Sequence, residues 1–204
     1  MTDGQTFWDT RYAQKDYVFG IEPNAFLARQ AGLLKPGTRA LAVADGEGRN
    51  GVWLAERGLL VQSVDSSHVA QSKARALAEA RGVTLDLTLA DLDTWRWPER
   101  EFDLVIAIFI QFAAPPLRIR IFEKMQRALK PGGLLLLEGY RPEQIAYGTG
   151  GPSAAENLYT EPVLRDAFAA LEIEELRAYD AAIQEGTGHD GVSALIDLVA
   201  RSRG

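Results

Sequence analysis

Cysteine is absent from this 204-residue sequence, and histidine occurs only twice. Without cysteine, the chain has no disulfide, no thiolate metal ligand and no cysteine nucleophile. The two histidines, His68 and His189, are too few to build a histidine cage around a metal ion. We therefore predict chemistry that uses neither thiols nor a bound metal.

Long apolar runs and a surplus of basic residues are also missing. No stretch approaches the roughly 18 apolar residues of a membrane span, and the first residues lack the basic and apolar regions of a signal peptide. The formal net charge of −6 would repel the phosphates of a nucleic acid. These features predict a cytoplasmic protein that binds neither membranes nor nucleic acids, and they leave its oligomeric state open.

Hydrophobic residues make up 47% of the chain, which suffices for one domain with a sizeable core. Short apolar runs alternate with good helix formers through the first 140 residues, a pattern typical of a parallel sheet with helical crossovers. The predicted strands span 40–44, 60–64, 84–89, 102–109 and 134–138. The predicted helices span 50–57, 69–80 and 117–129.

The end of the chain has a different pattern. A helix is predicted over 162–170, followed by strands over 173–182 and 193–201 that are joined by the segment 184–191. Two consecutive strands without a helix between them favour an antiparallel pair that closes the sheet. Before them, residues 141–157 form a long irregular insertion, and long loops in compact domains are usually functional or mobile.

The strongest local signal is a glycine turn between the first predicted strand and helix. Gly46-Glu-Gly-Arg-Asn-Gly51 satisfies the pattern G-x-G-x-x-G, in which glycines allow a sharp turn and a close approach to a ligand. Asp65 follows 19 positions after Gly46, where a carboxylate can accept hydrogen bonds from both ribose hydroxyls. The pattern fits a nicotinamide dinucleotide as well as S-adenosylmethionine.

Charge separates these two interpretations. A dinucleotide places a pyrophosphate on the turn, where Asp45 and Glu47 would repel it, whereas S-adenosylmethionine carries an ammonium and a sulfonium. The chain also lacks the pair of a tyrosine and a lysine four positions apart that a reductase would use. The acidic turn thus favours S-adenosylmethionine, and the alternatives are a nicotinamide-dependent oxidoreductase and a plain strand-to-helix turn.

Further motifs follow in order along the chain. They are Val64-Asp65-Ser-Ser, Ala90-Asp91-Leu92, Phe102-Asp-Leu-Val105 and Leu129-Lys-Pro-Gly-Gly133. With the glycine turn, this set resembles class I S-adenosylmethionine-dependent methyltransferases. Other motifs look like the tellurite-resistance and thiopurine methyltransferase-like branch, a resemblance that covers nearly the whole chain. They are Trp8-Asp-Thr-Arg-Tyr12, Tyr17-Val-Phe-Gly20, Glu22-Pro-Asn24 and Gly148-Thr-Gly-Gly-Pro152.

The resemblance implies an α/β fold. It is a Rossmann-like, doubly wound, seven-stranded sheet in the order 3-2-1-4-5-7-6 with strand seven antiparallel, inside a three-layer αβα sandwich. The antiparallel strand agrees with the terminal pair inferred above. We expect a single domain over 1–204, in which residues 1–38 form a helical and aromatic cap, 39–140 the cofactor-binding core, and 141–204 the acceptor-side insertion and closing strands.

The resemblance also implies roles for individual residues. Asp65 would bind the ribose, with capping of the next helix as the alternative. Asp91 and Leu92 would contact the adenine, although Asp91 could also be a plain solvated carboxylate. Aromatic residues of the cap segment 1–38, called the leader below, could face the sulfonium or simply pack on the domain. The full predicted cofactor set is Gly46, Glu47, Gly48, Asn50, Asp65, Ser66, Asp91, Leu92, Ala107, Ile108, Arg11 and Tyr12.

Three positions depart from the family pattern. Ala42 replaces an acidic residue late in the first strand, and Ala44 replaces the usual first glycine of the turn. Gln111 stands after the fourth strand, where relatives of the branch often have a histidine. Contacts to the methionine end of the cofactor and the identity of the acceptor are therefore the parts that the resemblance defines least.

The predicted reaction is an in-line transfer of the methyl group of S-adenosylmethionine to a small-molecule acceptor. A thiol, a metalloid or a similar soft nucleophile needs little proton removal, whereas an oxygen acceptor needs a base, for which Tyr140, Glu138 and His189 are candidates. The predicted acceptor side comprises Tyr140, Arg141, Tyr147 and His189, and no catalytic residue is assigned. The alternative class is a regulatory protein that binds the cofactor without turnover.

Overall fold

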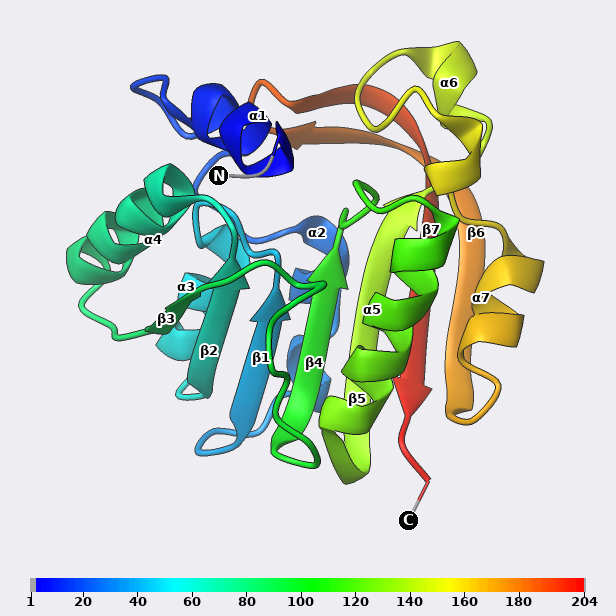
Figure 1. The fold of residues 1–204 in the computed structure, drawn as a ribbon, viewed down its shortest axis with the longest axis horizontal. Coiled ribbons are helices and arrows are strands. Elements are labelled where there is room, and N and C mark those ends of the chain that lie inside the picture. Colours follow the sequence, from blue (N-terminus) through cyan, green and yellow to red (C-terminus); the bar gives the residue numbers. More distant parts are fainter. Residues whose placement is uncertain (1–2, 204) are drawn as a thin grey trace. The chain divides into compact units, whose positions relative to one another are not determined.

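The computed structural model describes residues 3–203. Its strands form one seven-stranded sheet in the order β3-β2-β1-β4-β5-β7-β6, with β7 antiparallel to β5 and helices flanking the sheet (Figure 1). The predicted Rossmann-like fold, including its strand order, is thereby confirmed. The strands are β1 (Arg39–Val43), β2 (Leu60–Asp65), β3 (Asp86–Leu89), β4 (Phe102–Ile108), β5 (Leu129–Tyr140), β6 (Glu172–Glu185) and β7 (His189–Arg201).

Helices connect the strands along the chain, and others lie in the segments 1–38 and 141–204 on either side of the predicted core. The α-helices are α1 (Asp3–Tyr12), α2 (Ala25–Arg29), α3 (Arg49–Glu56), α4 (His68–Ala80), α5 (Pro115–Ala128), α6 (Gln144–Tyr147) and α7 (Glu161–Ala167). The 3-10 helices are η1 (Ala31–Leu33) and η2 (Ala155–Asn157). Among the residues described, no helix is both long and apolar enough to cross a membrane.

The chain divides into two compact units. The first extends to Trp95 and includes Glu185–Gly188, and the second comprises Arg96–Gln184 and the residues from His189 onward. The single-domain organisation predicted from the sequence stays a prediction.

The first unit contains β1, β2 and β3, which are all parallel. Four consecutive residues of β1, 40–43, are buried, as expected of a parallel strand covered on both faces. The crossovers that carry α3 and α4 advance in the same direction, so right-handed connections place both helices on one face. The carboxyl ends of β1 and β2 therefore lie side by side, with Val43 in register with Val64.

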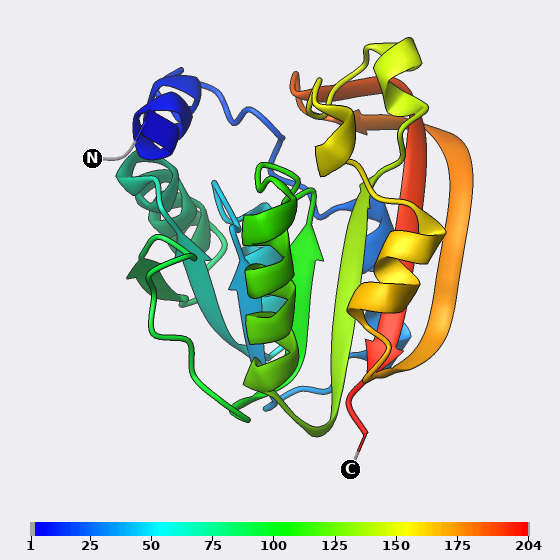
Figure 2. The ribbon, with the colours of Figure 1, turned by 45° about the vertical axis from the view of Figure 1, so that its right-hand side comes forward.

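The second unit contains β4, β5, β7 and β6. Residues 134–137 of β5 are all leucine and all buried, and they pair with β4 on one side and β7 on the other. Each such side chain contributes about 1.5–3 kcal/mol of burial free energy. Helices α5 and α7 pack on the strands of this unit (Figure 2). Gln126 of α5 donates a hydrogen bond to the carbonyl of Ala167.

Several predicted boundaries were wrong. Strand β5 already begins at Leu129, so the end of the predicted helix and the Pro-Gly-Gly segment belong to a strand with an irregular register against β4. Strands β6 and β7 extend to Glu185 and His189, which leaves residues 186–188 as the connection instead of 184–191. Pairing within the hairpin satisfies the backbone N–H and C=O groups of these residues, although their side chains are not typical of a strand. The insertion over 141–157 also contains a helical turn at each end.

Candidate functional site

The glycine turn connects β1 to α3 in the first unit. Gly46 and Gly48 have positive φ angles of 59° and 86°, a conformation that glycine adopts without steric cost. A Cβ at Gly48 would lie 2.6 Å from the Cβ of Ala74 on α4. The glycine at this position thus lets the start of α3 approach α4 closely.

Asp65 lies at the carboxyl end of β2, directly beside the turn. Its Oδ2 accepts a hydrogen bond of 2.9 Å from the backbone N–H of Gly46, and its Oδ1 accepts one of 2.8 Å from Ser67. Burial raises the pKa of Asp65, while the amides of Ser67, Gly46 and Ser66 oppose that rise. Helix α4 is capped by the Ser67 hydroxyl, which accepts a hydrogen bond from Ala70. Asp65 therefore braces the turn and the helix start together.

Tyr12 of the leader lies over the turn. Its hydroxyl would be 2.8 Å from a Cβ placed on Gly46, and its ring stacks on Trp8 at 5.6 Å. Burial, followed by the nearby charges of Asp65 and Glu47, raises the pKa of Tyr12 well above its usual value. The hydroxyl is thus neutral and can donate a hydrogen bond, and the nearby carboxyl groups of Asp65 and Glu47 favour a cationic ligand.

Arg11 lies on the exposed side of the same helix. Its guanidinium is 5.8 Å from the ring centre of Trp8 and 5.4 Å from that of Phe19. Tyr12, Val18 and Ala70 form a buried cluster against which Trp8 and Phe19 pack. The aromatic leader is thereby packed on α4, which was one of the two alternatives for these residues.

Glu47 is buried, and both of its carboxylate oxygens have partners within the protein. Oε2 accepts a hydrogen bond of 2.7 Å from the backbone N–H of Val18, and Oε1 forms an ion pair of 2.8 Å with Lys73 of α4. The predicted role of Glu47 as a direct cofactor contact stays a prediction, because its observed contacts hold the leader against the turn.

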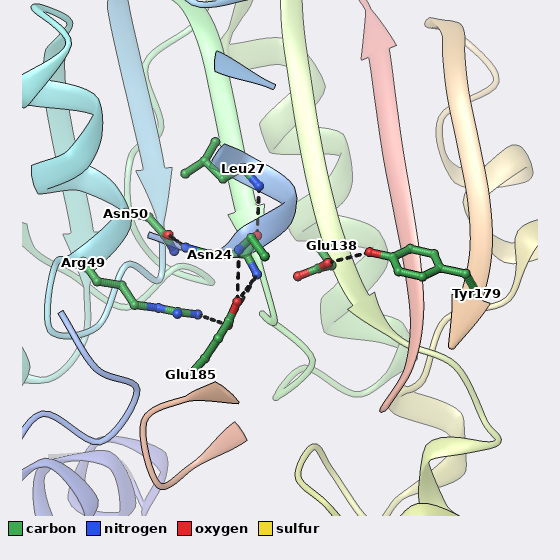
Figure 3. A network of polar contacts seen from close by, with 8 residues as sticks. Asn24, Leu27, Arg49, Asn50, Glu138, Tyr179 and Glu185 are labelled. Atoms are coloured by element: carbon green, nitrogen blue, oxygen red, sulfur yellow. Dashed lines mark hydrogen bonds and ion pairs between the residues drawn. The ribbon is translucent and has the colours of Figure 1, made fainter. Parts of the chain in front are cut away.

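Asn50 belongs to a polar network that the sequence analysis did not identify as part of the site. Its Oδ1 accepts a hydrogen bond of 2.9 Å from the backbone N–H of Asn24. Glu185 forms a buried ion pair of 2.6 Å with Arg49 and accepts a bond of 3.0 Å from the Asn24 amide (Figure 3). The motif Glu22-Pro-Asn24 was a signal for Asn24, whereas no sequence pattern pointed to Glu185.

The predicted adenine contacts follow β3. The backbone N–H of Ala90 donates a hydrogen bond of 2.9 Å to the carbonyl of Asp65, so the segment that begins with Asp91 and Leu92 leaves β3 beside the end of β2. Leu92 is buried. Asp91 is exposed, and its Oδ1 accepts a hydrogen bond from the Asp93 amide. The structure thus places ribose and adenine candidates next to each other in the first unit.

Ala107 and Ile108 end β4 in the second unit, and Ala107 is fully buried. The next residue, Phe109, has a φ angle of +54°, which is a genuine outlier for a bulky side chain. Its ring stacks on Tyr140 with 4.5 Å between ring centres and meets the His189 ring edge-on at 4.4 Å. Observed backbone strain of this kind tends to occur at functional sites.

Tyr140 and His189, both predicted on the acceptor side, are brought together by this aromatic cluster, with 5.6 Å between their rings. Gln111 holds the backbone of Tyr140 at both ends: its Oε1 accepts a bond of 2.6 Å from the N–H, and its Nε2 donates one of 2.9 Å to the carbonyl. Gln111 therefore orients Tyr140. Glu138, on the same strand, accepts a hydrogen bond of 3.3 Å from Tyr179 (Figure 3).

Arg141 and Tyr147 meet at a common partner, Asp180 of β6. Arg141 forms an ion pair with one oxygen of that carboxylate, and the Tyr147 hydroxyl donates a bond of 2.8 Å to the other. The adjacent glycine-rich loop packs on Tyr140, since a Cβ at Gly151 would lie 2.7 Å from its ring. The four predicted acceptor-side residues thus form two groups in the second unit, one aromatic and one ionic.

Ala44, at the position of the missing first glycine, has a φ angle of +49°. A left-handed conformation costs a residue with a Cβ about 1–2 kcal/mol. Glycine would relieve this strain, but it would also make the unfolded chain more flexible, which offsets part of the gain in stability. We expect Ala44→Gly to raise the free energy of unfolding by about 0.5–1 kcal/mol. Ala42→Gly, inside β1, is the matched control and should lower it by a similar amount. Urea denaturation measures both changes. A destabilised Ala44→Gly variant would show that the backbone of Ala44 is not strained.

The fold and the glycine turn define a Rossmann-like cofactor-binding protein. Residues 40–133, a little under half of the chain, match a family model described as a methyltransferase domain. The chain thus carries a methyltransferase domain, and its enzyme class is that of the S-adenosylmethionine-dependent methyltransferases, with S-adenosylmethionine as the cofactor. None of the curated proteins matches this chain.

Solved structures extend the similarity over nearly the whole length. A protein of echinomycin biosynthesis, studied for the conversion of a disulfide bond into a thioacetal group, has a TM-score of 0.80 at 22% identity, with 98% of this chain and 91% of that chain covered. A methyltransferase from Methanosarcina mazei has 0.71 at 17%, covering 89% and 99%. TehB from Haemophilus influenzae has 0.71 at 14%, covering 98% and 67%. At these identities, the likeness establishes the fold.

Proposed function

We propose that this protein transfers the methyl group of S-adenosylmethionine to a small molecule whose acceptor atom is a soft nucleophile, such as a thiol or a metalloid. The observation that carries the cofactor assignment is the acidic glycine turn, where Asp65 braces the Gly46 amide and Tyr12 lies above it. Such a turn attracts an ammonium and a sulfonium and repels a pyrophosphate. It therefore supports S-adenosylmethionine over a nicotinamide dinucleotide.

The proposed cofactor contacts are those expected from the sequence. The carboxylate of Asp65 accepts hydrogen bonds from the ribose, and Asp91 and Leu92 contact the adenine. When bound, S-adenosylmethionine supplies a methyl carbon that is activated by the positive sulfonium. The chain's own residues bind and align the reactants and exclude water, which are the main contributions that an in-line displacement requires.

The aromatic cluster of the second unit supports a soft acceptor. Phe109, Tyr140 and His189 present ring faces and edges, which suit a polarizable sulfur or a metalloid. The Gln111 amide is engaged with the backbone of Tyr140, where a histidine of the relatives could act as a base. The echinomycin protein, whose described chemistry concerns sulfur, has the same fold. An acceptor that needs little deprotonation fits these features.

Further expectations belong to the same proposal. The leader and loop motifs, together with the fold shared with TehB, support the tellurite-resistance and thiopurine methyltransferase-like branch. The net charge of −6 supports a cytoplasmic enzyme that acts on small molecules and does not bind nucleic acids or membranes. We propose that residues 1–204 function as one domain.

Calorimetry and an acceptor screen test the function together. We expect S-adenosylmethionine and S-adenosylhomocysteine to bind to the purified protein and NADH not to bind. We also expect S-adenosylhomocysteine to form with thiol, selenium or tellurium acceptors, and more slowly with phenols and amines. Binding without turnover on any acceptor would favour the regulatory alternative. Binding of NADH alone would overturn the cofactor assignment.

A further inference from the structure

We propose that Glu185, at the tip of the β6–β7 hairpin, is a positioning residue for the cofactor turn, a proposal that rests on the function proposed above. Glu185 is 136 positions from Arg49 in sequence, yet its Oε2 lies 2.6 Å from the Arg49 guanidinium. Both side chains are less than a tenth exposed. Removing one partner of an ion pair buried this deeply would leave the other charge buried and unpaired, which is strongly unfavourable.

Glu185 acts on the first two residues of α3, which follow Gly48 directly. It binds Arg49 itself, and it reaches Asn50 through Asn24. The side-chain amide of Asn24 donates a hydrogen bond to Glu185, and the backbone N–H of Asn24 donates one of 2.9 Å to the Asn50 side chain (Figure 3). The start of the helix that carries the proposed cofactor contact Asn50 is therefore fixed from the hairpin.

The same carboxylate also fixes the leader. Its Oε1 accepts a bond of 3.1 Å from the backbone N–H of Ala25, and the Asn24 Oδ1 caps α2 by accepting one of 3.0 Å from Leu27. Farther up the leader, Val18 donates to Glu47 of the turn, and its carbonyl accepts a bond of 3.0 Å from Gly188 of the hairpin. Turn, leader and hairpin tip thus form one hydrogen-bonded layer with Glu185 at its centre.

This layer gives Glu185 a role beyond folding stability. The leader carries Tyr12, which lies over Gly46, and the turn carries Asn50. If the hairpin anchor is lost, Tyr12 and Asn50, both proposed cofactor contacts, can shift while the strands of the sheet remain paired. Small displacements of pre-positioned groups have large effects on binding and rate.

Two variants test the proposal. Glu185→Gln keeps one oxygen acceptor but loses the charge opposite Arg49. The double variant Arg49→Met/Glu185→Leu replaces both partners with apolar side chains, which avoids a stranded charge. It also removes the acceptor of the Asn24 amide and the Ala25 N–H, so the contact with the leader is lost as well. The matched control is Glu174→Gln. Glu174 lies on β6, as Glu185 does, and the change breaks its ion pair of 2.5 Å with Arg201 of β7. Thermal unfolding monitors whether each variant folds.

Two measurements distinguish positioning from plain stability. Hydrogen exchange without ligand should accelerate at the amides of residues 18–25 in both test variants, and the dissociation constant for S-adenosylhomocysteine should rise about tenfold, a coupling of ordinary size. The control should change neither. Unchanged exchange, or faster exchange with unchanged affinity, would overturn the role of Glu185. If the wild-type protein fails to bind S-adenosylhomocysteine, the proposed function itself is wrong, whereas the exchange result still reports on the anchor.

Discussion

Replacing Asp65 with alanine is expected to weaken S-adenosylhomocysteine binding by about two orders of magnitude or more, because each hydrogen bond to a charged group contributes about 1.5–3 kcal/mol. The ribose would lose its acceptor, and the Gly46 and Ser67 amides would lose theirs. Titration calorimetry with the wild-type protein and the variant measures the change. S-adenosylmethionine should show the same loss, since both ligands contain the ribose.

The control for this variant is Asp86→Ala. Asp86 is an exposed aspartate at the amino end of β3, the strand that pairs with β2, so its loss should leave ligand affinity unchanged. Asp65→Ala should also lower the melting temperature, because two amides at the turn lose their partner. Retained affinity in a folded Asp65→Ala variant would refute the ribose assignment.

The second large effect concerns Asp45, the carboxyl group beneath the turn. Burial raises its pKa from 3.8 to about 7, with Asp65 adding to the rise and Ser63, Gly51 and Arg49 opposing it. A raised carboxyl pKa means that the folded protein binds more protons than the unfolded chain between about pH 4 and 7. Stability is therefore highest below this window and falls as the pH rises through it.

Asp45→Asn should remove this pH-dependent loss. Its amide can still accept from the Gly51 N–H and donate to the Ser63 hydroxyl, the groups that now contact the two Asp45 oxygens. We expect the variant to be more stable than the wild-type protein at pH 8 by on the order of 2 kcal/mol, discounted for partial solvent access. The difference should shrink toward zero near pH 4.

Urea denaturation across this pH range measures the effect. Asp103→Asn, which breaks a partly exposed ion pair with Lys130, is the control and should show no gain at pH 8. An Asp45→Asn variant that is less stable at every pH, or whose advantage does not depend on pH, would rule out the buried charge as the cause.

Much of the fold was predictable because it depends on short-range patterns. Apolar runs separated by helix formers indicated β1, β2 and β4, and the pair of terminal strands indicated the antiparallel end. The boundaries that were wrong involve backbone pairing. Strand β5 continues through Pro131 and the glycines after it, and β6 and β7 continue through a polar connection, because hydrogen bonding across the sheet overrides local propensity.

In the candidate site, the positions of the glycine turn and Asp65 were predictable from the sequence, whereas the contacts of other side chains were not. The glycine turn and Asp65 have a fixed spacing that reflects one strand-turn-helix unit, so the sequence located both. The contacts of Glu47, Gln111 and Glu185 depend on partners at least 26 positions away, and no periodicity records such pairs. A side chain assigned to a ligand from its position alone can therefore be engaged within the protein.

The amino-acid sequence was enough to predict an α/β fold with an acidic glycine turn suited to a cationic adenosyl cofactor. These properties follow from hydrophobic alternation, glycine geometry and local charge, which act over a few residues. The folded structure was needed to show which carboxylates brace the turn, that Ala44 and Phe109 adopt positive φ angles, and that the hairpin tip contacts α3. Those features arise from residues that folding alone brings together, so their energies depend on burial and distance.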